Sequence, residues 1–139
     1  SSPEERKIPP DRWEIIEQLA YDHGGSAQHD PRPERAVEGA TMVYTDVWAS
    51  MGEKREAEER RELFKPYKVT SRLMERAGKG AVFGHCLPAE SSEVDEDVLY
   101  GPQSIVFTIA GCRTSTTAAL IQLLLKDPPS WTSWHGNGT

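Results

Sequence analysis

Ala81-Val82-Phe83-Gly84-His85-Cys86-Leu87-Pro88 is a short apolar run that leads into a histidine, a cysteine, a leucine and a proline. The apolar residues predict a buried strand, and the proline ends it, because proline cannot donate a hydrogen bond to a strand ladder. In open α/β sheets, ligands bind beyond the carboxyl ends of the strands. The stretch therefore predicts that His85, Cys86 and Leu87 lie at the ligand-binding edge of a sheet.

Two other apolar runs are followed by polar residues in the same way. Residues 42–47 have the β-branched and aromatic content of a strand, and Asp46 lies near their end. Residues 104–107 predict a third strand, and Arg113 follows it closely. We expect the three strand ends to converge and to bring a carboxylate, a thiol and a guanidinium to one site. Such a set suits an amino-acid-like substrate.

The rest of the chain alternates helices with strands. Helices are predicted at residues 11–23, 33–39, 53–64, 71–77, from 93–97 onward and at 116–125, and a further short strand at 26–29. Asp11 with Glu14 predicts a capped start for the first helix, and Thr70 predicts a cap for the helix at 71–77. Alternation of this kind implies a parallel sheet with right-handed crossovers. The fold class is therefore predicted to be α/β, a partial doubly wound parallel sheet flanked by helices.

Residues 93–97 form an acidic run that carries four carboxylates. One interpretation is a metal site, and the other is a solvated helix start, which negative charges favour because of the helix macrodipole. We prefer the second, because acidic runs face solvent far more often than they bind metal. The sequence also has no zinc-ligand spacing, no Gly-rich phosphate loop and no serine-nucleophile elbow. We therefore expect neither a metal nor a cofactor.

The length and composition fit one soluble globular domain, with 139 residues of which 37% are hydrophobic and 27% charged. The chain has 22 acidic and 16 basic residues and a net charge of -6. This balance argues against nucleic acid or an anionic membrane as the main partner, because phosphate binding requires a basic face. The sequence contains no run of about 18 apolar residues, so it predicts no membrane span.

The two ends of the chain differ from its centre. Residues 1–10 predict a flexible lead, residues 11–127 a domain and residues 128–139 a flexible tail. The start resembles neither a signal peptide nor a transit segment, and it lacks a Met, so we expect a piece or a processed form of a protein. The two cysteines, Cys86 and Cys112, have no close pair spacing, which favours a reduced intracellular setting.

Each candidate residue also has a purely structural interpretation. Cys86 is either a small buried filler or a thiol whose pKa neighbouring positive charge lowers, so that the thiolate pairs with an ammonium group. His85 is more often a hydrogen-bonded structural residue than a base. Asp46 equally suits a cap of the following turn, and Arg113 suits an exposed surface position.

Two motifs at this spacing identify a family. Thr45-Asp46-Val47-Trp48-Ala49-Ser50-Met51-Gly52 followed by His85-Cys86-Leu87-Pro88 resembles ornithine carbamoyltransferase, and specifically its C-terminal, ornithine-binding domain. The similarity runs from about residue 13 to residue 125 and includes residues 93–98 and 101–107. The resemblance implies a Rossmann-like half of a two-domain transcarbamylase.

The activity that the resemblance implies is transfer of the carbamoyl group from carbamoyl phosphate to the δ-amine of ornithine. The products are citrulline and phosphate, in arginine biosynthesis or the urea cycle. The family also implies a homotrimer. We expect a location in the cytoplasm or, in a eukaryote, in the mitochondrial matrix.

The resemblance also implies roles for individual residues. Asp46 corresponds to the residue that holds the α-amino group of ornithine. Ser50 and Met51 touch the amino-acid end of the substrate from a loop. Cys86 lies by the δ-amine, with the backbone of Leu87 near the carbamoyl group. Arg113 would polarise the carbamoyl oxygen, as the second catalytic residue beside Cys86.

The chain also departs from the family pattern. Gly111-Cys112 stand where the family has Glu-Asn, and Gly84 stands where a bulky apolar residue is usual. The phosphate-gripping Ser-x-Arg-Thr motif of the N-terminal domain is not in these residues, and neither is the strand-helix-strand that opens the C-terminal domain. We therefore expect the isolated chain to be inactive, and the strand at 42–47 to have an uncovered edge. The alternative is a non-catalytic module of this fold that binds an amino acid or a partner chain.

Overall fold

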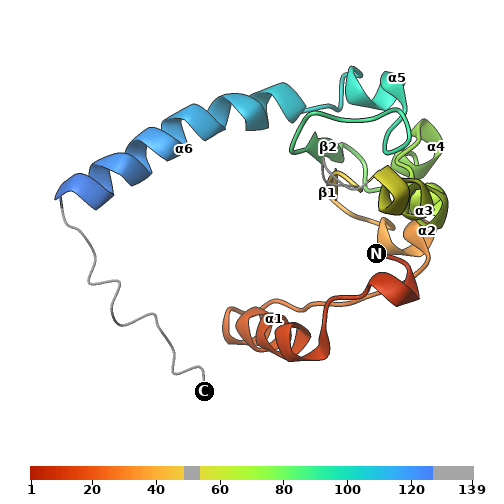
Figure 1. The fold of residues 1–139 in the computed structure, drawn as a ribbon, viewed down its shortest axis with the longest axis horizontal. Helices are drawn as coiled ribbons and strands as arrows, with labels where there is room; N and C mark the ends of the chain where they lie inside the picture. The colour runs from red at the N-terminus through yellow and green to blue at the C-terminus, as the bar shows by residue number, and fades with distance from the viewer. Residues whose placement is uncertain (49–53, 127–139) are drawn as a thin grey trace. The chain divides into compact units, whose positions relative to one another are not determined.

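The computed structural model describes residues 1–48 and 54–126, and the chain forms two compact units, Ser1–Val106 and Phe107–Thr139. The elements in chain order are η1 (Glu4–Arg6), α1 (Pro10–Asp22), α2 (Pro33–Ala36), β1 (Met42–Thr45), α3 (Lys54–Phe64), η2 (Lys65–Tyr67), α4 (Ser71–Met74), β2 (Val82–His85), α5 (Glu96–Leu99) and α6 (Val106–Lys126) (Figure 1). This is a mixed helix and strand fold with a small parallel sheet, consistent with the predicted partial α/β fold. The predicted tail, residues 128–139, lies outside the described residues.

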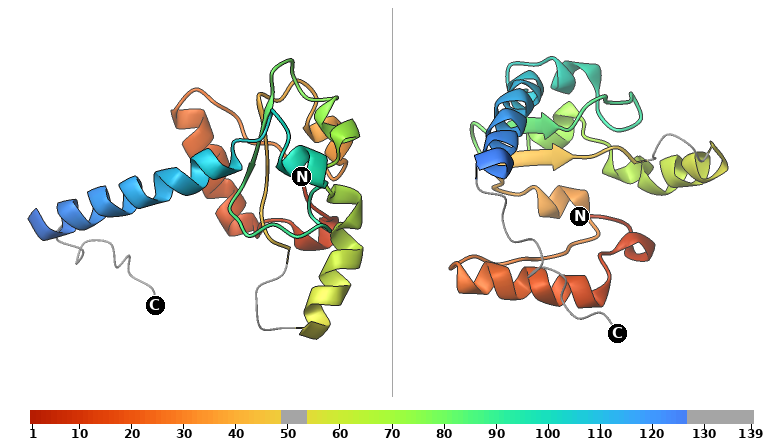
Figure 2. Two further views of the ribbon diagram at one scale, coloured as in Figure 1. Left: turned by 90° about the horizontal axis from the view of Figure 1, so that it is seen from above. Right: turned by 60° about the vertical axis from the view of Figure 1, so that its left-hand side comes forward.

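The sheet of the first unit consists of β1 and β2, which pair in parallel with Val43 opposite Phe83 and Thr45 opposite His85. Both arrows point the same way in the right-hand view of Figure 2. The two strands predicted at residues 42–47 and before His85 are thereby confirmed. Their β-branched and aromatic residues suit the packed surface of a sheet, and Phe83 is completely buried.

Buried apolar residues of the sheet and of the segments around it form a core cluster in the described part of the chain. It comprises Val37, Val43, Val69, Leu73, Met74, Ala81, Phe83, Val94, Val98 and Val106. Burying a side chain of this size contributes about 1.5–3 kcal/mol relative to leaving it in water. The cluster therefore fixes the sheet against the short helices that carry its outer members.

The short helices α4 and α5 cover this cluster and lie next to each other (Figure 1). Thr70 caps α4 as predicted, because its Oγ1 accepts a hydrogen bond from the backbone N–H of Leu73 at 3.2 Å. Ser71 at the start of α4 donates its hydroxyl to the carboxylate of Asp97 in α5. Leu73 and Met74 then point inward, with exposed fractions of 7% and 5%.

The strand predicted at residues 104–107 is wrong. Only one parallel bridge forms there, between Phe83 and Ser104, with hydrogen bonds from Phe83 N–H to the carbonyl of Gln103 and from Ile105 N–H to the carbonyl of Phe83. From Val106 onward the chain is helical as α6, which starts ten residues before the predicted 116–125 helix. The β-branched content of the run suggested a strand, but strand propensity yields to context. Within the described residues, no helix is long and apolar enough to cross a membrane.

The N-terminal region departs from two further predictions. Helix α1 starts after Pro9 without a side-chain cap, so the capping box of Asp11 and Glu14 is wrong. Pro10 suits the first helical position, because a backbone N–H there would have no partner within the helix and proline has no N–H. The helix ends at Asp22, close to the predicted end at residue 23, and Gly24 follows its C-cap residue with a φ of +72°, which suits glycine. No strand forms at residues 26–29, and the predicted lead contains η1.

Among the described residues, β1 pairs with β2 on one side only, as predicted for this strand, whereas β2 also bridges to Ser104 on its far side. An open strand edge presents unpaired backbone groups. The surface beside β1 is therefore available to further chain or to a ligand.

We expect Thr70→Ala to lower the free energy of unfolding by about 1 kcal/mol, because the N–H of Leu73 loses its acceptor. Thr70→Ser keeps a hydroxyl at the same position and serves as the matched control. Urea unfolding followed by circular dichroism measures both. Equal midpoints for Thr70→Ala and the parent chain would contradict the cap.

Candidate functional site

The pairing of β1 with β2 brings two of the predicted site residues into contact. Thr45 lies opposite His85 at the end of the sheet, so Asp46 and Cys86 are the first residues beyond it. The Cys86 thiol donates to Oδ1 of Asp46 at 2.9 Å. The same oxygen accepts the backbone N–H of Val47 at 2.8 Å, so Asp46 also caps the turn that follows β1.

The electrostatics of this pair differ from the expectation for Cys86. Its thiol hydrogen bond, followed by the Val47 N–H, lowers the pKa of the Asp46 carboxyl. Partial burial, followed by the hydrogen bond to Asp46, raises the pKa of the Cys86 thiol. The prediction of a lowered thiol pKa is therefore wrong, because burial disfavours the thiolate and the charged group that contacts the thiol is a carboxylate rather than a cation. At neutral pH the site presents a charged carboxylate beside a protonated thiol.

His85 is fully buried and serves a structural purpose, as its more common role suggested. Its Nδ1 accepts the backbone N–H of Leu87 at 2.9 Å. The proton of the neutral ring therefore sits on Nε2. This hydrogen bond supports Leu87 in a left-handed conformation with φ of +56°, which costs a non-glycine residue about 1–2 kcal/mol. The bond between Leu87 and Pro88 is cis.

Glu93 is the residue that the sequence interpretation missed. It belongs to the acidic run expected to face solvent, yet its exposed fraction is 2%. Its Oε1 accepts the backbone N–H of Trp48 at 2.9 Å and its Oε2 accepts that of Glu90 at 2.8 Å. The one local sign that part of this run is buried was Val94, an apolar residue within it. Val94 forms a buried bridge with Val69.

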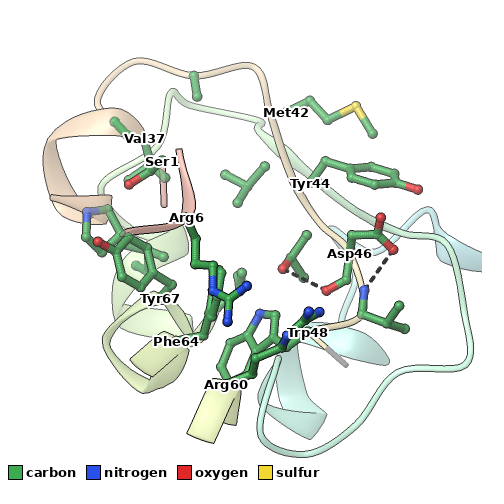
Figure 3. A pocket seen from close by; sticks show the side chains of 18 residues that line it. Ser1, Arg6, Val37, Met42, Tyr44, Asp46, Trp48, Arg60, Phe64 and Tyr67 are labelled. Carbon is green, nitrogen blue, oxygen red and sulfur yellow. Dashed lines mark hydrogen bonds between the residues drawn. The ribbon is translucent and has the colours of Figure 1, made fainter. Parts of the chain in front are cut away.

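An open groove of about 550 Å³ runs along β1 in the first unit (Figure 3). Trp48, Phe64 and Tyr67 form an aromatic row on it, with ring centroids 5.8 Å apart for the first pair and 5.9 Å for the second. Asp46 lies at the end of β1 and also lines the groove. The carboxylate is therefore reachable from a concave, partly aromatic surface.

The structure does not test whether three other predicted site residues lie near this pair. Ser50 and Met51 lie outside the described residues. Arg113 does not follow a strand end but lies exposed within α6, in the second compact unit. Its predicted place in a shared site with Asp46 and Cys86 stays a prediction. Within residues 1–48 and 54–126, no group of three or more acidic, histidine or cysteine side chains is arranged to hold a metal ion.

The chain is similar to known carbamoyltransferases along most of its length. Residues 1–124 match the family described as aspartate/ornithine carbamoyltransferase, Asp/Orn binding domain. The sequence is 57% identical over 91 residues to the ornithine carbamoyltransferase of Pyrobaculum aerophilum, which covers 65% of this chain and 30% of that protein. It is 44% identical over 126 residues to the one from Symbiobacterium thermophilum, which covers 90% of this chain and 41% of that protein.

A solved structure shows the same relation. Ornithine carbamoyltransferase from Pyrococcus furiosus matches with a TM-score of 0.70 and 42% sequence identity, over 76% of this chain and 34% of that one. The chain thus spans between 30% and 41% of the length of these relatives.

Alkylation of Cys86 as a function of pH tests its contact with Asp46. A raised pKa in the folded chain means that the protonated thiol stabilises the fold below the ordinary thiol pKa, and that this stability is lost as pH rises through the folded pKa. We expect Asp46→Asn to lower the thiol pKa, so that Cys86 reacts severalfold faster with iodoacetamide near pH 8.

Mass spectrometry of the Cys86 peptide gives the rate, and the exposed Cys112 of the same chain is the internal control. A Cys86 profile that Asp46→Asn leaves unchanged would show that the two groups do not interact in solution.

Proposed function

Because the chain belongs to the aspartate/ornithine carbamoyltransferase family, within its Asp/Orn binding domain, we propose that it is the ornithine-binding part of an ornithine carbamoyltransferase. The reaction is transfer of the carbamoyl group of carbamoyl phosphate to the δ-amine of ornithine, with citrulline and phosphate as products. The observation that carries this proposal is the contact of Asp46 with Cys86 at the carboxyl ends of two parallel strands.

The two groups of this contact suit the two amines of ornithine. The α-ammonium group is charged at neutral pH, and the Asp46 carboxylate, with its lowered pKa, offers it a negative partner. The δ-amine must be uncharged to attack a carbonyl carbon. A thiolate would stabilise a protonated amine beside it. The pKa of the Cys86 thiol is raised, so the thiol stays uncharged and suits a neutral δ-amine.

The remaining roles follow from the family motifs. Ser50 and Met51 contact the amino-acid end of ornithine, the backbone of Leu87 lies near the carbamoyl group, and Arg113 polarises the carbamoyl oxygen. Holding the two substrates in line lowers the barrier by up to about 7–11 kcal/mol in favourable systems. A donor aimed at the developing oxyanion adds about 3–4 kcal/mol.

The chain spans at most 41% of the length of the relatives described above, and we place the phosphate-gripping part of the carbamoyl-phosphate site in the family's N-terminal domain, whose Ser-x-Arg-Thr motif is not in these residues. We assign the complete protein to arginine biosynthesis, as a homotrimer in the cytoplasm or, in a eukaryote, the mitochondrial matrix. The family membership is the support for the pathway and for the homotrimer.

The alternative function is a non-catalytic module that keeps the fold and binds an amino acid or a partner chain. Gly111-Cys112, in place of Glu-Asn before Arg113, is the observation that favours it. The coding sequence upstream distinguishes the two functions. An in-frame Ser-x-Arg-Thr segment supports the enzyme, and an unrelated upstream domain supports the module.

In the complete protein, we expect Asp46→Asn to lower kcat/KM for ornithine by roughly 10- to 150-fold, the equivalent of one lost charged hydrogen bond of about 1.5–3 kcal/mol. The KM for carbamoyl phosphate should not change. Steady-state citrulline formation measures both, and Glu96→Gln, at an exposed carboxylate of α5, is the matched control. An unchanged kcat/KM for ornithine in Asp46→Asn would remove Asp46 from the substrate site.

The 139-residue chain alone should form no citrulline from ornithine and carbamoyl phosphate, because it lacks the motif that grips phosphate. A colorimetric citrulline assay at micromolar chain concentration measures this. Citrulline production above the buffer rate would refute the assignment of the phosphate site to another part of the protein.

A further inference from the structure

The contact of Asp46 with Cys86 lies just beyond the point where strand pairing stops. The last paired residues of β1 and β2 are Thr45 and His85, so among the described residues strand pairing does not continue into the segments that follow. A contact in that position needs other support, because loop segments without ladder hydrogen bonds open at low cost. The support has to reach both segments at once.

Glu93 meets this requirement. On the β1 side, its Oε1 accepts the backbone N–H of Trp48 at 2.9 Å, two residues after Asp46. On the β2 side, its Oε2 accepts the N–H of Glu90 at 2.8 Å and lies 3.3 Å from Nε2 of His85, the residue before Cys86. The His85 approach is close, but its direction is not that of a formed hydrogen bond.

The chemistry of these contacts requires a carboxylate. Two backbone N–H groups point at two different oxygens of Glu93. The amide of glutamine has one oxygen, so its NH₂ group would face one of those donors. A buried N–H left without an acceptor costs about 1–3 kcal/mol. Glutamine would therefore release either the Trp48 segment or the Glu90 segment.

We propose that Glu93 is a positioning residue that holds Asp46 against Cys86 by binding the main chain on both sides of the pair. It acts through hydrogen bonds and not through proton transfer to the thiol. The Cys86 Sγ is 3.9 Å from Nδ1 of His85, and that nitrogen already accepts the Leu87 N–H. A relay from Glu93 through His85 to the thiol therefore lacks a free nitrogen.

The pH profile of Cys86 alkylation tests this role in the 139-residue chain. In the part of the chain that the structure describes, Asp46 and His85 are the titratable groups that contact the thiol. We expect Glu93→Gln to shift the profile toward that of Asp46→Asn, with severalfold faster reaction near pH 8. Glu96→Gln, an acid-to-amide change at an exposed position of α5, should leave the profile at that of the parent chain.

The double variant Glu93→Gln/Asp46→Asn separates positioning from a general loosening of the fold. If Glu93 acts through Asp46, the double variant should coincide with Asp46→Asn alone. A further shift in the double variant would overturn the proposal, and so would a Glu93→Gln profile identical to that of the parent.

Circular dichroism establishes which variants fold. If Glu93→Gln does not fold, Glu93→Asp decides the outcome, because it keeps both acceptor oxygens on a side chain one methylene shorter. A profile between those of the parent and Asp46→Asn supports the positioning role, and a parent profile overturns it.

The meaning of this role for ornithine rests on the proposed function, but the thiol measurement requires no substrate. Unchanged kinetics for Asp46→Asn in the complete protein would therefore contradict the proposed function and leave the role of Glu93 standing. A parent-like thiol profile for Glu93→Gln would contradict the role of Glu93 and leave the proposed function standing.

Discussion

The parallel register of β1 and β2 is the constraint on which the rest of the first unit depends. It places Thr45 beside His85, and so brings together Asp46 and Cys86, which are 40 residues apart in the chain. The strands supply position through backbone hydrogen bonds and the burial of Phe83. The reactive groups begin one residue after the pairing stops, at the edge where α/β sheets bind their ligands.

At that edge, Asp46 is held in its deprotonated form and Cys86 in its protonated form. The thiol hydrogen bond keeps Asp46 charged, and burial with the carboxylate keeps Cys86 protonated. One site thus offers a fixed negative charge and an uncharged sulfur side by side. That asymmetry allows a site to treat two amines of one substrate differently, with one held as an ammonium ion and the other left neutral.

Local patterns in the sequence predicted the parts of the fold that depend on neighbouring residues. The apolar runs of β1 and β2 and the cap at Thr70 are such features, and the structure contains each of them. The run at residues 104–107 misled because its β-branched residues suit either a strand or a buried helix start, and contact with β2 is limited to one bridge. Long-range packing decides such cases, and sequence periodicity does not record it.

Glu93 illustrates the same limit within the site. An acid in a charged run is normally solvated, and its burial here depends on a donor from Trp48, 45 residues away. No local pattern encodes that partner. The Asp46 and Cys86 motifs were recognisable from the sequence because each is a short stretch, whereas the carboxylate that spans them becomes visible only in three dimensions.

A crystal structure of the complete protein with bound ornithine is the most direct measurement of the central claim. The account predicts that the α-ammonium nitrogen lies within hydrogen-bond distance of the Asp46 carboxylate and that the δ-nitrogen lies beside the Cys86 sulfur. Ornithine bound with neither amine at the Asp46–Cys86 pair would contradict it.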